Sequence, residues 1–291
     1  MTKTFGIIAN PDKYSVKNAL LKVINWSISN KQHIVLTPKL EPLYSQKSSS
    51  IRVVPTEQDV IDQSDIVISI GGDGTMLWTA QLMTYVDSKP ILGINSGRLG
   101  FLANTPFLEI EATLNEVLAN RYKLDKRYFL EAKHHSLGKR YALNEFLFGK
   151  KDSSAMVNII AKYDGQLINK YWSDGLIVAG PTGSTAYNLS SGGPIVLPST
   201  NVIIVTPINP HTLTTRPLVL PSNGKLEIIV EKQNNELLFS YDGEQLEIPE
   251  YPFEVEVTQS SVFVEIIELY QHSYFITLRN KLMWGRDSRE S

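Results

Sequence analysis

A glycine-rich turn that carries a single carboxylate, Gly71-Gly72-Asp73-Gly74-Thr75, is the first candidate for chemistry in this sequence. Its glycines permit tight backbone geometry and the close approach of an anion. Backbone N–H groups in such a turn, and at the start of a following helix, bind phosphates. The Asp73 carboxylate would repel those phosphates unless it accepts a proton or helps to hold a metal ion. A plain strand-to-helix turn, with Asp73 or Thr75 as the helix cap, explains the same residues equally well.

A second candidate is the segment from Asp174 to Pro194, which is dense in glycine, serine and threonine and contains Tyr187. Hydroxyl groups and free N–H groups at this density suit recognition of ribose, phosphate or an amide. The ring of Tyr187 is able to stack on a nucleotide base. The alternative is a long hairpin loop with a buried tyrosine, and composition alone leaves both interpretations open.

Two familiar nucleotide-binding patterns are absent from the sequence. It contains no G-x-x-x-x-G-K-[ST] segment, which excludes a P-loop NTPase. The first apolar run, residues 5–9, continues into Asn10-Pro11-Asp12 and not into a G-x-G-x-x-G turn. An ordinary NAD-dependent dehydrogenase is therefore disfavoured.

The elements that must position these residues alternate between strands and helices over the first hundred residues. Short apolar runs predict strands at 5–9, 33–37, 65–70 and 90–94. Apolar spacings of three and four predict a helix over 14–28, and another is expected directly after the glycine turn. Apolar strands separated by helices are typical of a parallel sheet covered on both faces. Ligands of such sheets bind at the carboxyl ends of the strands, which directs attention to residues 71–75 and 95–101.

From about residue 128 the sequence becomes rich in short strands. The expected strands are 128–134, 141–148, 156–163, 167–172, 176–179, 202–206, 225–231, 236–241 and 253–257. Hairpin turns are expected at Asp164-Gly165, Asn234-Asn235 and Asp242-Gly243. Many short strands joined by such turns are typical of a sandwich-like β domain.

Two further segments complete the expected elements. A helix that contains Leu114, Val117 and Leu118 is expected to link the two regions, within residues 103–127. Residues 274–277 are expected to form a last strand, followed by a frayed polar tail at 285–291.

The composition limits the class of protein. The 291 residues include 28 Lys and Arg against 30 Asp and Glu, a formal net charge of −2, and the chain contains no cysteine. A dedicated nucleic-acid binder is usually basic, so this balance argues against one. No apolar run reaches the ~18 residues of a membrane helix, and the N-terminus lacks the pattern of a signal peptide. A cytoplasmic protein that binds neither membranes nor nucleic acids is the simplest interpretation.

Several motifs together resemble the NAD kinase family. The glycine turn alone is shared with diacylglycerol, sphingosine and phosphofructokinase-type kinases. The stretch from Asp174 through Pro181-Thr182-Gly183-Ser184-Thr185-Ala186-Tyr187 to Asn188 is specific to NAD kinases. Further matching motifs are Gly93 to Leu102, Asn144-Glu145, Pro210-His211-Thr212-Leu213, Arg216-Pro217-Leu218, and Leu278, Lys281, Leu282 and Trp284. The resemblance extends over about residues 5–284, nearly the whole chain.

The resemblance implies transfer of the γ-phosphate of ATP to the 2′-hydroxyl of the adenosine ribose of NAD, giving NADP, with Mg²⁺ or another divalent cation. It implies that Asp73 is the general base and that Gly72, Gly74 and Thr75 hold phosphates. A ribose hydroxyl is a poor nucleophile, and a nearby carboxylate can take its proton as attack proceeds. The residues implied in dinucleotide binding are Phe101, Asn144, Glu145, Asp174, Thr182, Thr185, Ala186, Tyr187 and Ser190.

The resemblance also implies the organisation of the chain. A Rossmann-like α/β domain that binds nucleotide is expected to comprise residues 1–103 and 275–291. A β-sandwich-like, NAD-binding domain is expected as an insertion over residues 104–274. Members of the family are commonly homodimers or homotetramers, so the same is expected here.

The sequence departs from the family pattern at four positions. Trp172 stands where several bacterial relatives carry arginine, and Ala155 where some carry histidine. Gly180 replaces a usual threonine, and Glu244 replaces a usual glutamine. None of these is the expected base, so the departures bear on the choice of phosphoryl donor and on preference for NAD or NADH.

Two rival functions come from the same residues. A lipid kinase of the same superfamily does not explain the segment 174–188. A non-catalytic NADP(H) sensor that kept the fold has no need of Asp73.

Other polar residues receive structural interpretations. His134-His135 lies in a strand-like segment without matching carboxylates, so no metal site is assigned. His211 is interpreted as structural, and Lys150-Lys151 and Lys123 to Arg127 as solvated surface. Arg98 follows the fourth strand, where phosphate contact and a salt bridge or loop anchor explain it equally well.

Overall fold

The computed structural model describes residues 2–85, 88–97, 99–151, 155–232 and 237–283. The chain forms two compact units, each described by itself. Residues before Arg127 and residues from Val264 onward form the first unit, and Arg127–Phe263 form the second. The expected boundaries, after residue 103 and before residue 275, both fall inside the first unit. One reason is that helix α4 (Ile110–Leu118) buries its apolar face in the core of the first unit.

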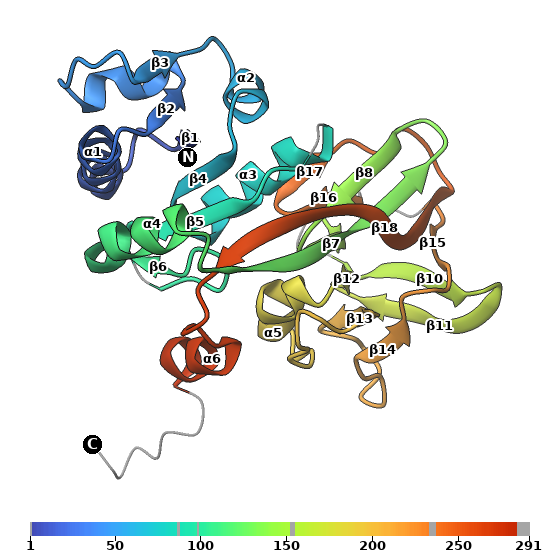
Figure 1. Cartoon of the computed structure of the whole chain (residues 1–291). Coiled ribbons are helices and arrows are strands. Elements are labelled where there is room, and N and C mark those ends of the chain that lie inside the picture. The colour runs from blue at the N-terminus through green and yellow to red at the C-terminus, as the bar shows by residue number, and fades with distance from the viewer. Residues whose placement is uncertain (1, 86–87, 98, 152–154, 233–236, 284–291) are drawn as a thin grey trace. The chain divides into compact units, whose positions relative to one another are not determined.

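A parallel sheet forms the centre of the first unit (Figure 1). Its strands are β1 (Thr4–Ala9), β2 (His33–Leu36), β3 (Ile51–Val53), β4 (Ile66–Gly71), β5 (Ile91–Asn95) and the end of β18 (Phe253–Glu268). The order across the sheet is β3-β2-β1-β4-β5-β18, and neighbouring strands run parallel. The four strands expected in this region are confirmed. The sequence does not predict β3, because its three residues are largely exposed and form no apolar run.

The two faces of this sheet carry side chains of different size. The helices are α1 (Tyr14–Ser29), α2 (Glu57–Asp62), α3 (Asp73–Leu82) and α4, with 3-10 turns at Pro38–Leu43, Met83–Tyr85 and Phe107–Glu109 and a short strand β6 (Thr105–Pro106). Helices α1 and α4 cover one face, and α2 and α3 cover the other. Ile7 of β1 lies in the apolar core that α1 and α4 complete. On the other face, a Cβ at Gly6 would lie 2.8 Å from Val60 of α2, and Thr79 of α3 donates a hydrogen bond to Ser69 of β4. Small residues therefore let α2 and α3 pack closely on that face.

The strand order reverses between β1 and β4. The chain adds β2 and β3 on one side of β1, and then adds β4 and β5 on the other side. In open parallel sheets a ligand crevice forms at such a reversal, beyond the carboxyl ends of the strands. Here those ends lead into Asn10-Pro11 and into the glycine turn. The fold therefore carries Asp73 to the edge at which sheets of this kind bind ligands.

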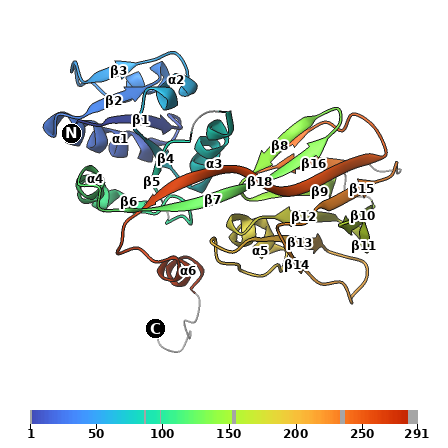
Figure 2. The ribbon, with the colours of Figure 1, turned by 45° about the vertical axis from the view of Figure 1, so that its right-hand side comes forward.

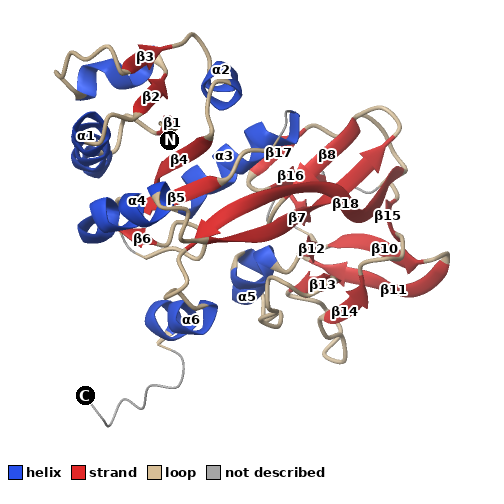
Figure 3. Cartoon of the chain, viewed as in Figure 1, coloured by secondary structure: helices blue, strands red, loops and turns tan. Residues whose placement is uncertain are grey.

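The second unit is a sandwich of two antiparallel sheets (Figures 2 and 3). One has the order β14 (Leu218–Pro221), β13 (Val202–Ile208), β12 (Gly175–Ala179), β9 (Glu145–Lys150), β16 (Leu237–Tyr241) and β17 (Glu244–Leu246). The other contains β11 (Gln166–Ser173), β10 (Val157–Tyr163), β15 (Leu226–Val230) and β18, with β7 (Lys123–His134) beside β18 and β8 (Gly138–Ala142) beside β7. A cluster of buried side chains from both sheets fills the space between them. The expected α/β region with a sandwich-like β region is confirmed.

Two of the expected hairpin turns are confirmed by their backbone angles. Asp164 and Gly165 have φ angles of 49° and 76°, and Asp242 and Gly243 have φ angles of 45° and 90°. Positive φ at both central positions is the geometry of a type I′ turn, which Asp-Gly favours. The third expected turn, Asn234-Asn235, lies outside the described residues.

The glycine-, serine- and threonine-rich segment after β12 folds into a 3-10 turn (Thr182–Thr185) and the short helix α5 (Tyr187–Ser190). The buried amide of Asn188 donates to the carbonyls of Ser184 and Pro194 and accepts a hydrogen bond from Thr206 at 2.6 Å. A Cβ at Gly193 would overlap the Asn188 side chain. Part of this motif therefore serves packing within the second unit.

The expected strand at residues 274–277 is wrong, because these residues begin helix α6 (Tyr274–Leu282). Aromatic and β-branched residues favour a strand locally. The helix, however, buries Leu278 and brings the ring of Tyr274 to 6.1 Å from that of Phe101. Packing within the first unit thus overrides the local preference. Trp284 and the tail 285–291 lie outside the described residues.

None of the helices in the described part of the chain has the length and apolar character required to cross a membrane.

Candidate functional site

Asp73 is the first residue of α3, and Gly72 is the N-cap of that helix. A Cβ at Gly71 would overlap the hydroxyl of Thr75, so this turn from β4 into α3 requires glycine there. A Cβ at Gly72 or Gly74 would meet no atom within 4 Å, so these two glycines leave open space beside the helix N-terminus. The first N–H groups of a helix have no carbonyl partner within it and form an anion-binding position.

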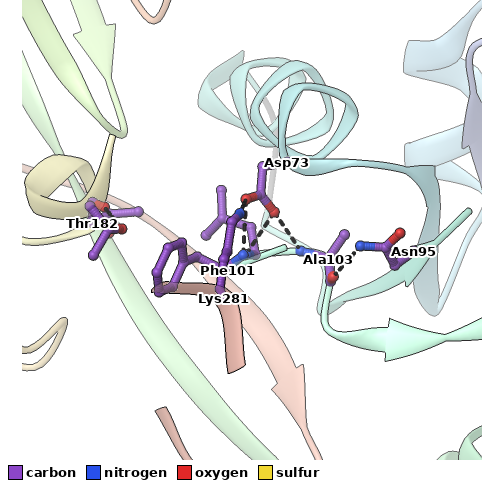
Figure 4. A network of polar contacts seen from close by, with 8 residues as sticks. Asp73, Asn95, Phe101, Ala103, Thr182 and Lys281 are labelled. Carbon is purple, nitrogen blue, oxygen red and sulfur yellow. Dashed lines mark hydrogen bonds and ion pairs between the residues drawn. The ribbon is translucent and has the colours of Figure 1, made fainter. Parts of the chain in front are cut away.

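The carboxylate of Asp73 binds four hydrogen-bond donors (Figure 4). Its Oδ1 accepts from the N–H of Leu102 at 2.9 Å and from the N–H of Ala103 at 3.1 Å. Its Oδ2 accepts from the N–H of Phe101 at 2.9 Å and from Nζ of Lys281 at 2.9 Å. The loop after β5 therefore wraps around this carboxylate, and a lysine from α6 completes its surroundings.

These donors keep Asp73 ionised. Burial is the largest single influence and would raise the pKa of Asp73. The hydrogen bond from Lys281 and the three from the backbone together outweigh burial and lower the pKa below its usual value. Sequence reasoning did not identify Lys281 as a site residue, because 208 residues separate it from Asp73. Its one signal is its place in the C-terminal motif of the family resemblance.

Phe101 lies against α6. Its half-buried ring has Nζ of Lys281 at 4.6 Å from the ring centroid and the ring of Tyr274 at 6.1 Å. Its backbone N–H at the same time binds Asp73. Phe101 is thus brought together with the glycine turn, as expected of a site residue, while Arg98 lies outside the described residues.

A cavity of about 510 Å³ lies beyond the ends of β1 and β4, at the reversal of strand order. Its lining includes Asn10, Asp12, Lys13, Lys39, Glu57, Gly74, Thr75 and Trp78. Trp78 is 50% exposed, and the ammonium of Lys39 lies 3.7 Å from the carboxylate of Glu57. The glycine turn therefore borders a cavity that offers two lysines and an indole ring. Sequence reasoning missed Lys13, Lys39 and Trp78, because no local motif connects them.

In the second unit, Asn144 and Glu145 lie in a turn that Asp242 holds. Oδ1 of Asp242 accepts from the N–H groups of Asn144 at 2.8 Å and Glu145 at 3.2 Å, and Oδ2 accepts from Leu143 at 2.8 Å. These bonds divide the expected strand 141–148 into β8 and β9. The carbonyl of Asn144 accepts the N–H of Gly180 at 3.0 Å, which joins the turn to the segment after β12. Sequence reasoning assigned Asp242 only to a hairpin turn.

Glu145 is half-buried, with its Oε2 atom buried, and its carboxyl group favours the protonated form. Burial, followed by the negative charge of Asp242, raises the pKa of Glu145 from the usual 4.5 to about 8, although a hydrogen bond from the N–H of Tyr187 lowers it. Its Oε2 has no hydrogen-bond partner among the described residues. A protonated carboxyl can donate one hydrogen bond and accept others, which suits a ligand hydroxyl.

The candidate residues Thr182, Thr185, Ala186, Tyr187 and Ser190 lie in the 3-10 turn, along α5 and at the junction between them. Tyr187 exposes 43% of its surface and binds Glu145 through its backbone. The buried Thr182 accepts a hydrogen bond from Nη1 of Arg127 at 3.4 Å. The expectation that Arg127 is solvated is therefore wrong. The structure brings Asn144, Glu145 and the 182–190 residues into one group.

Asp174 lies apart from this group. β9 and β12 pair so that Ala179 is opposite Glu145, which leaves Asp174 five residues away along the strand at about 3.3 Å per residue. Its carboxylate pairs with Nζ of Lys150 at 2.6 Å and accepts from Nδ2 of Asn209 at 3.1 Å, and both contacts lower its pKa. Lys150, expected at the solvated surface, is thus the partner of a candidate site residue.

The fold brings the carboxylate of Glu250 close to His134 and His135, which the sequence alone does not predict. Nε2 of His135 lies 2.9 Å from Oε1 of Glu250. Nδ1 of His134 accepts the N–H groups of Ser136 and Leu137, so the proton of the neutral ring is on Nε2. That nitrogen has no lone pair for a metal ion, and the trio is therefore poorly suited to bind one.

One departure from the family pattern has a visible packing partner. The ring of Trp172 lies against that of His211 in a tilted arrangement, with centroids 4.3 Å apart, and the Trp172 carbonyl accepts the N–H of His211 at 2.9 Å. His211 therefore takes part in packing, as interpreted. A Cβ at Gly180 would lie 3.7 Å from Leu130, an ordinary contact, so the fold does not require glycine there.

Family models match both regions of the chain. The ATP-NAD kinase N-terminal domain matches residues 5–122, and the ATP-NAD kinase C-terminal domain matches residues 143–269, together more than half of the chain. NAD kinase of Cytophaga hutchinsonii is 40% identical over 239 residues, which cover 80% of each chain. NAD kinase of Sulfurimonas denitrificans is 34% identical over 286 residues, which cover 97% of this chain and 98% of that one.

Two solved structures share the fold. A yeast NADH kinase complexed with NADH aligns with a TM-score of 0.89 at 24% identity, covering 100% of this chain and 90% of that one. An NAD kinase from Archaeoglobus fulgidus in complex with ATP aligns with a TM-score of 0.74 at 22% identity, covering 97% of each chain. By its matching family models and its similar relatives, this chain belongs to the NAD kinase family.

Proposed function

We propose that this NAD kinase transfers the γ-phosphate of ATP to the 2′-hydroxyl of the adenosine ribose of NAD, with Asp73 as the group that accepts the hydroxyl proton. The observation that carries the role of Asp73 is its position, because an ionised carboxylate stands at the N-terminus of α3 beside two open glycines. The low pKa of Asp73 is compatible with this role. The ribose hydroxyl becomes strongly acidic only as its oxygen bonds to phosphorus, so the proton is transferred late.

The phosphates of ATP are proposed to bind at the helix N-terminus that Gly72, Gly74 and Thr75 form. Two features support this position. Backbone N–H groups there attract anions, and the adjoining cavity offers the ammonium groups of Lys13 and Lys39. The exposed indole of Trp78 at the same cavity provides a flat apolar surface for a nucleotide base.

A divalent cation such as Mg²⁺ is proposed as a requirement, and the cavity residues fit one. Asp12 and Glu57 line the cavity, and carboxylate oxygens are the ligands that Mg²⁺ takes together with substrate phosphates. When bound, such an ion would neutralise negative charge on the phosphates of ATP. Asp73 is a poorer ligand for it, because four donors already occupy its oxygens.

NAD is proposed to bind through the second unit, with Phe101 of the first unit lining an adenine pocket. The residues proposed to contact it are Asn144, Glu145, Asp174, Thr182, Thr185, Ala186, Tyr187 and Ser190. The protonated Glu145 and the exposed ring of Tyr187 suit a ribose hydroxyl and a base, and Asp174 suits an amide NH₂. In this proposal the first unit is the nucleotide-binding domain and the second unit the NAD-binding domain.

The setting of the enzyme is also a proposal. We place it in the cytoplasm, where ATP and NAD are both available, and as a homodimer or homotetramer in common with the family. Gel filtration with light scattering would measure the oligomeric state directly.

The test of the function is NADP formation by the purified protein from NAD, ATP and Mg²⁺, with an NADP-specific dehydrogenase as reporter. The proposal predicts turnover that requires all three components. Dinucleotide binding in calorimetry without turnover would replace it with an NADP(H) sensor. Absence of both binding and turnover would redirect the search to another acceptor of the same superfamily.

A further inference from the structure

The carboxylate of Asp73 has no free position for a substrate hydroxyl. A carboxylate offers about four lone-pair sites on its two oxygens. Three backbone N–H groups and Nζ of Lys281 occupy four such positions around Asp73. A hydroxyl that gives its proton to Asp73 must first donate a hydrogen bond to it, so one of these donors must give up its place.

The three backbone donors are fixed by the loop that carries them. A Cβ at Gly100 would overlap the Asp73 carboxylate, so the loop approaches as closely as glycine permits. The carbonyl of Ala103 accepts the N–H of Gly100 at 3.2 Å and the buried Asn95 amide at 3.2 Å, which closes the loop on itself (Figure 4). Removal of any one N–H from Asp73 would require this loop to reorganise.

Lys281 differs from the backbone donors in freedom and in accessibility. Its ammonium ends a flexible four-carbon chain, and its side chain is 32% exposed. The face of the Phe101 ring lies 4.6 Å from the ammonium and would still attract it after the hydrogen bond to Asp73 is broken. Lys281 is therefore the donor that can move at least cost to the fold.

The charge of Lys281 has a second consequence at this position. A bare carboxylate at the N-terminus of α3 would repel the phosphates that the helix end attracts. An ammonium 2.9 Å from Oδ2 compensates that charge without occupying the open space beside Gly72 and Gly74.

We propose that Lys281 is a positioning residue for Asp73: it holds the carboxylate in place in the free enzyme, and it is the donor that the acceptor hydroxyl of the substrate displaces. The inference rests on the proposed role of Asp73. It also gives α6 a part in the reaction, because folding of the first unit brings Lys281 of this helix to the glycine turn.

The test uses the full chain with Lys281→Met and Lys281→Arg, each made also with Asp73→Asn. We expect Lys281→Met to lower kcat on the order of tenfold, because misplaced catalytic groups cost rate, and to leave the KM for NAD and for ATP unchanged or lower. Lys281→Arg retains the charge and is expected to restore most of kcat. In the Asp73→Asn protein, Lys281→Met is expected to have no further effect, because Lys281 acts through that carboxylate.

The matched control is Arg279→Met, which removes a positive charge from an exposed position of the same helix. Its kcat and melting temperature are expected to equal those of the wild type. Three results would overturn the inference: an unchanged kcat for Lys281→Met, a rise in the KM for ATP, or a further loss of activity in the Asp73→Asn protein. A wild-type protein that forms no NADP would instead refute the proposed function, and the role of Lys281 with it.

Discussion

At the scale of single residues, Asp73 and Glu145 are carboxyl groups in opposite electrostatic surroundings. Four donors stabilise the charged form of Asp73. Glu145 is half-buried near the negative charge of Asp242, with the N–H of Tyr187 as its stabilising donor. At neutral pH the first is ionised and the second protonated, a division that lets one accept a proton and the other donate a hydrogen bond.

Glu145→Gln is expected to make stability less dependent on pH. Between pH 4.5 and about 8 the folded protein keeps a proton on Glu145 that the unfolded chain releases, so the free energy of unfolding decreases as the pH rises. The contribution of this one group is about 1.4 kcal/mol per pH unit in that window. Melting temperatures of both proteins at pH 5, 6, 7 and 8 measure it. The melting temperature of the variant should rise relative to that of the wild type as the pH rises. Parallel curves of melting temperature against pH would refute the raised pKa of Glu145.

At the scale of elements, hairpin β16–β17 supports the turn between β8 and β9. The Asp242 carboxylate at its tip binds three successive backbone N–H groups, as Asp73 does in the first unit. A turn that is proposed to bind NAD is thereby fixed by a residue about a hundred positions away in the chain. This makes Asp242 a support for Asn144 and Glu145.

Asp242→Asn is expected to raise the KM for NAD on the order of tenfold while kcat changes less than about threefold, because the variant loses charge-assisted hydrogen bonds worth about 1.5–3 kcal/mol. Steady-state kinetics with NAD as the varied substrate measure both constants. Asp164→Asn is the matched control: Asp164 occupies the same position of another Asp-Gly turn, with its Oδ1 bound to the N–H of Lys225. Equal effects of the two substitutions on the KM for NAD would contradict the assignment.

Prediction from sequence succeeds for elements whose signals lie in their own residues. The apolar runs of β1, β2, β4 and β5 and the Asp-Gly turns have local physical causes, and they are found where expected. α6 is mispredicted because its aromatic, β-branched start resembles a strand, while the contact with Phe101 that stabilises it is remote. Lys281 and Asp242 escape prediction for the same reason: only the folded chain brings them to Asp73 and to the Asn144 turn.

At the scale of the whole molecule, the chain divides its proposed tasks between two compact units and passes between them through β7 and β18. The first unit holds the residues proposed for phosphoryl transfer, and the second holds most of those proposed for NAD recognition. Substitutions should therefore separate into two kinetic classes. Changes at the glycine turn and α6 should act on kcat, and changes around Asn144 and Glu145 should act on the KM for NAD.

The most direct test of this account is the kcat of Asp73→Asn together with its affinity for NAD in calorimetry. The account predicts a fall in kcat of about 10²–10⁴-fold, the usual contribution of a catalytic base, with the Kd for NAD unchanged. A melting temperature close to that of the wild type would show that the loop around residue 73 is intact. A variant that keeps most of its kcat would contradict the assignment of Asp73 as the proton acceptor.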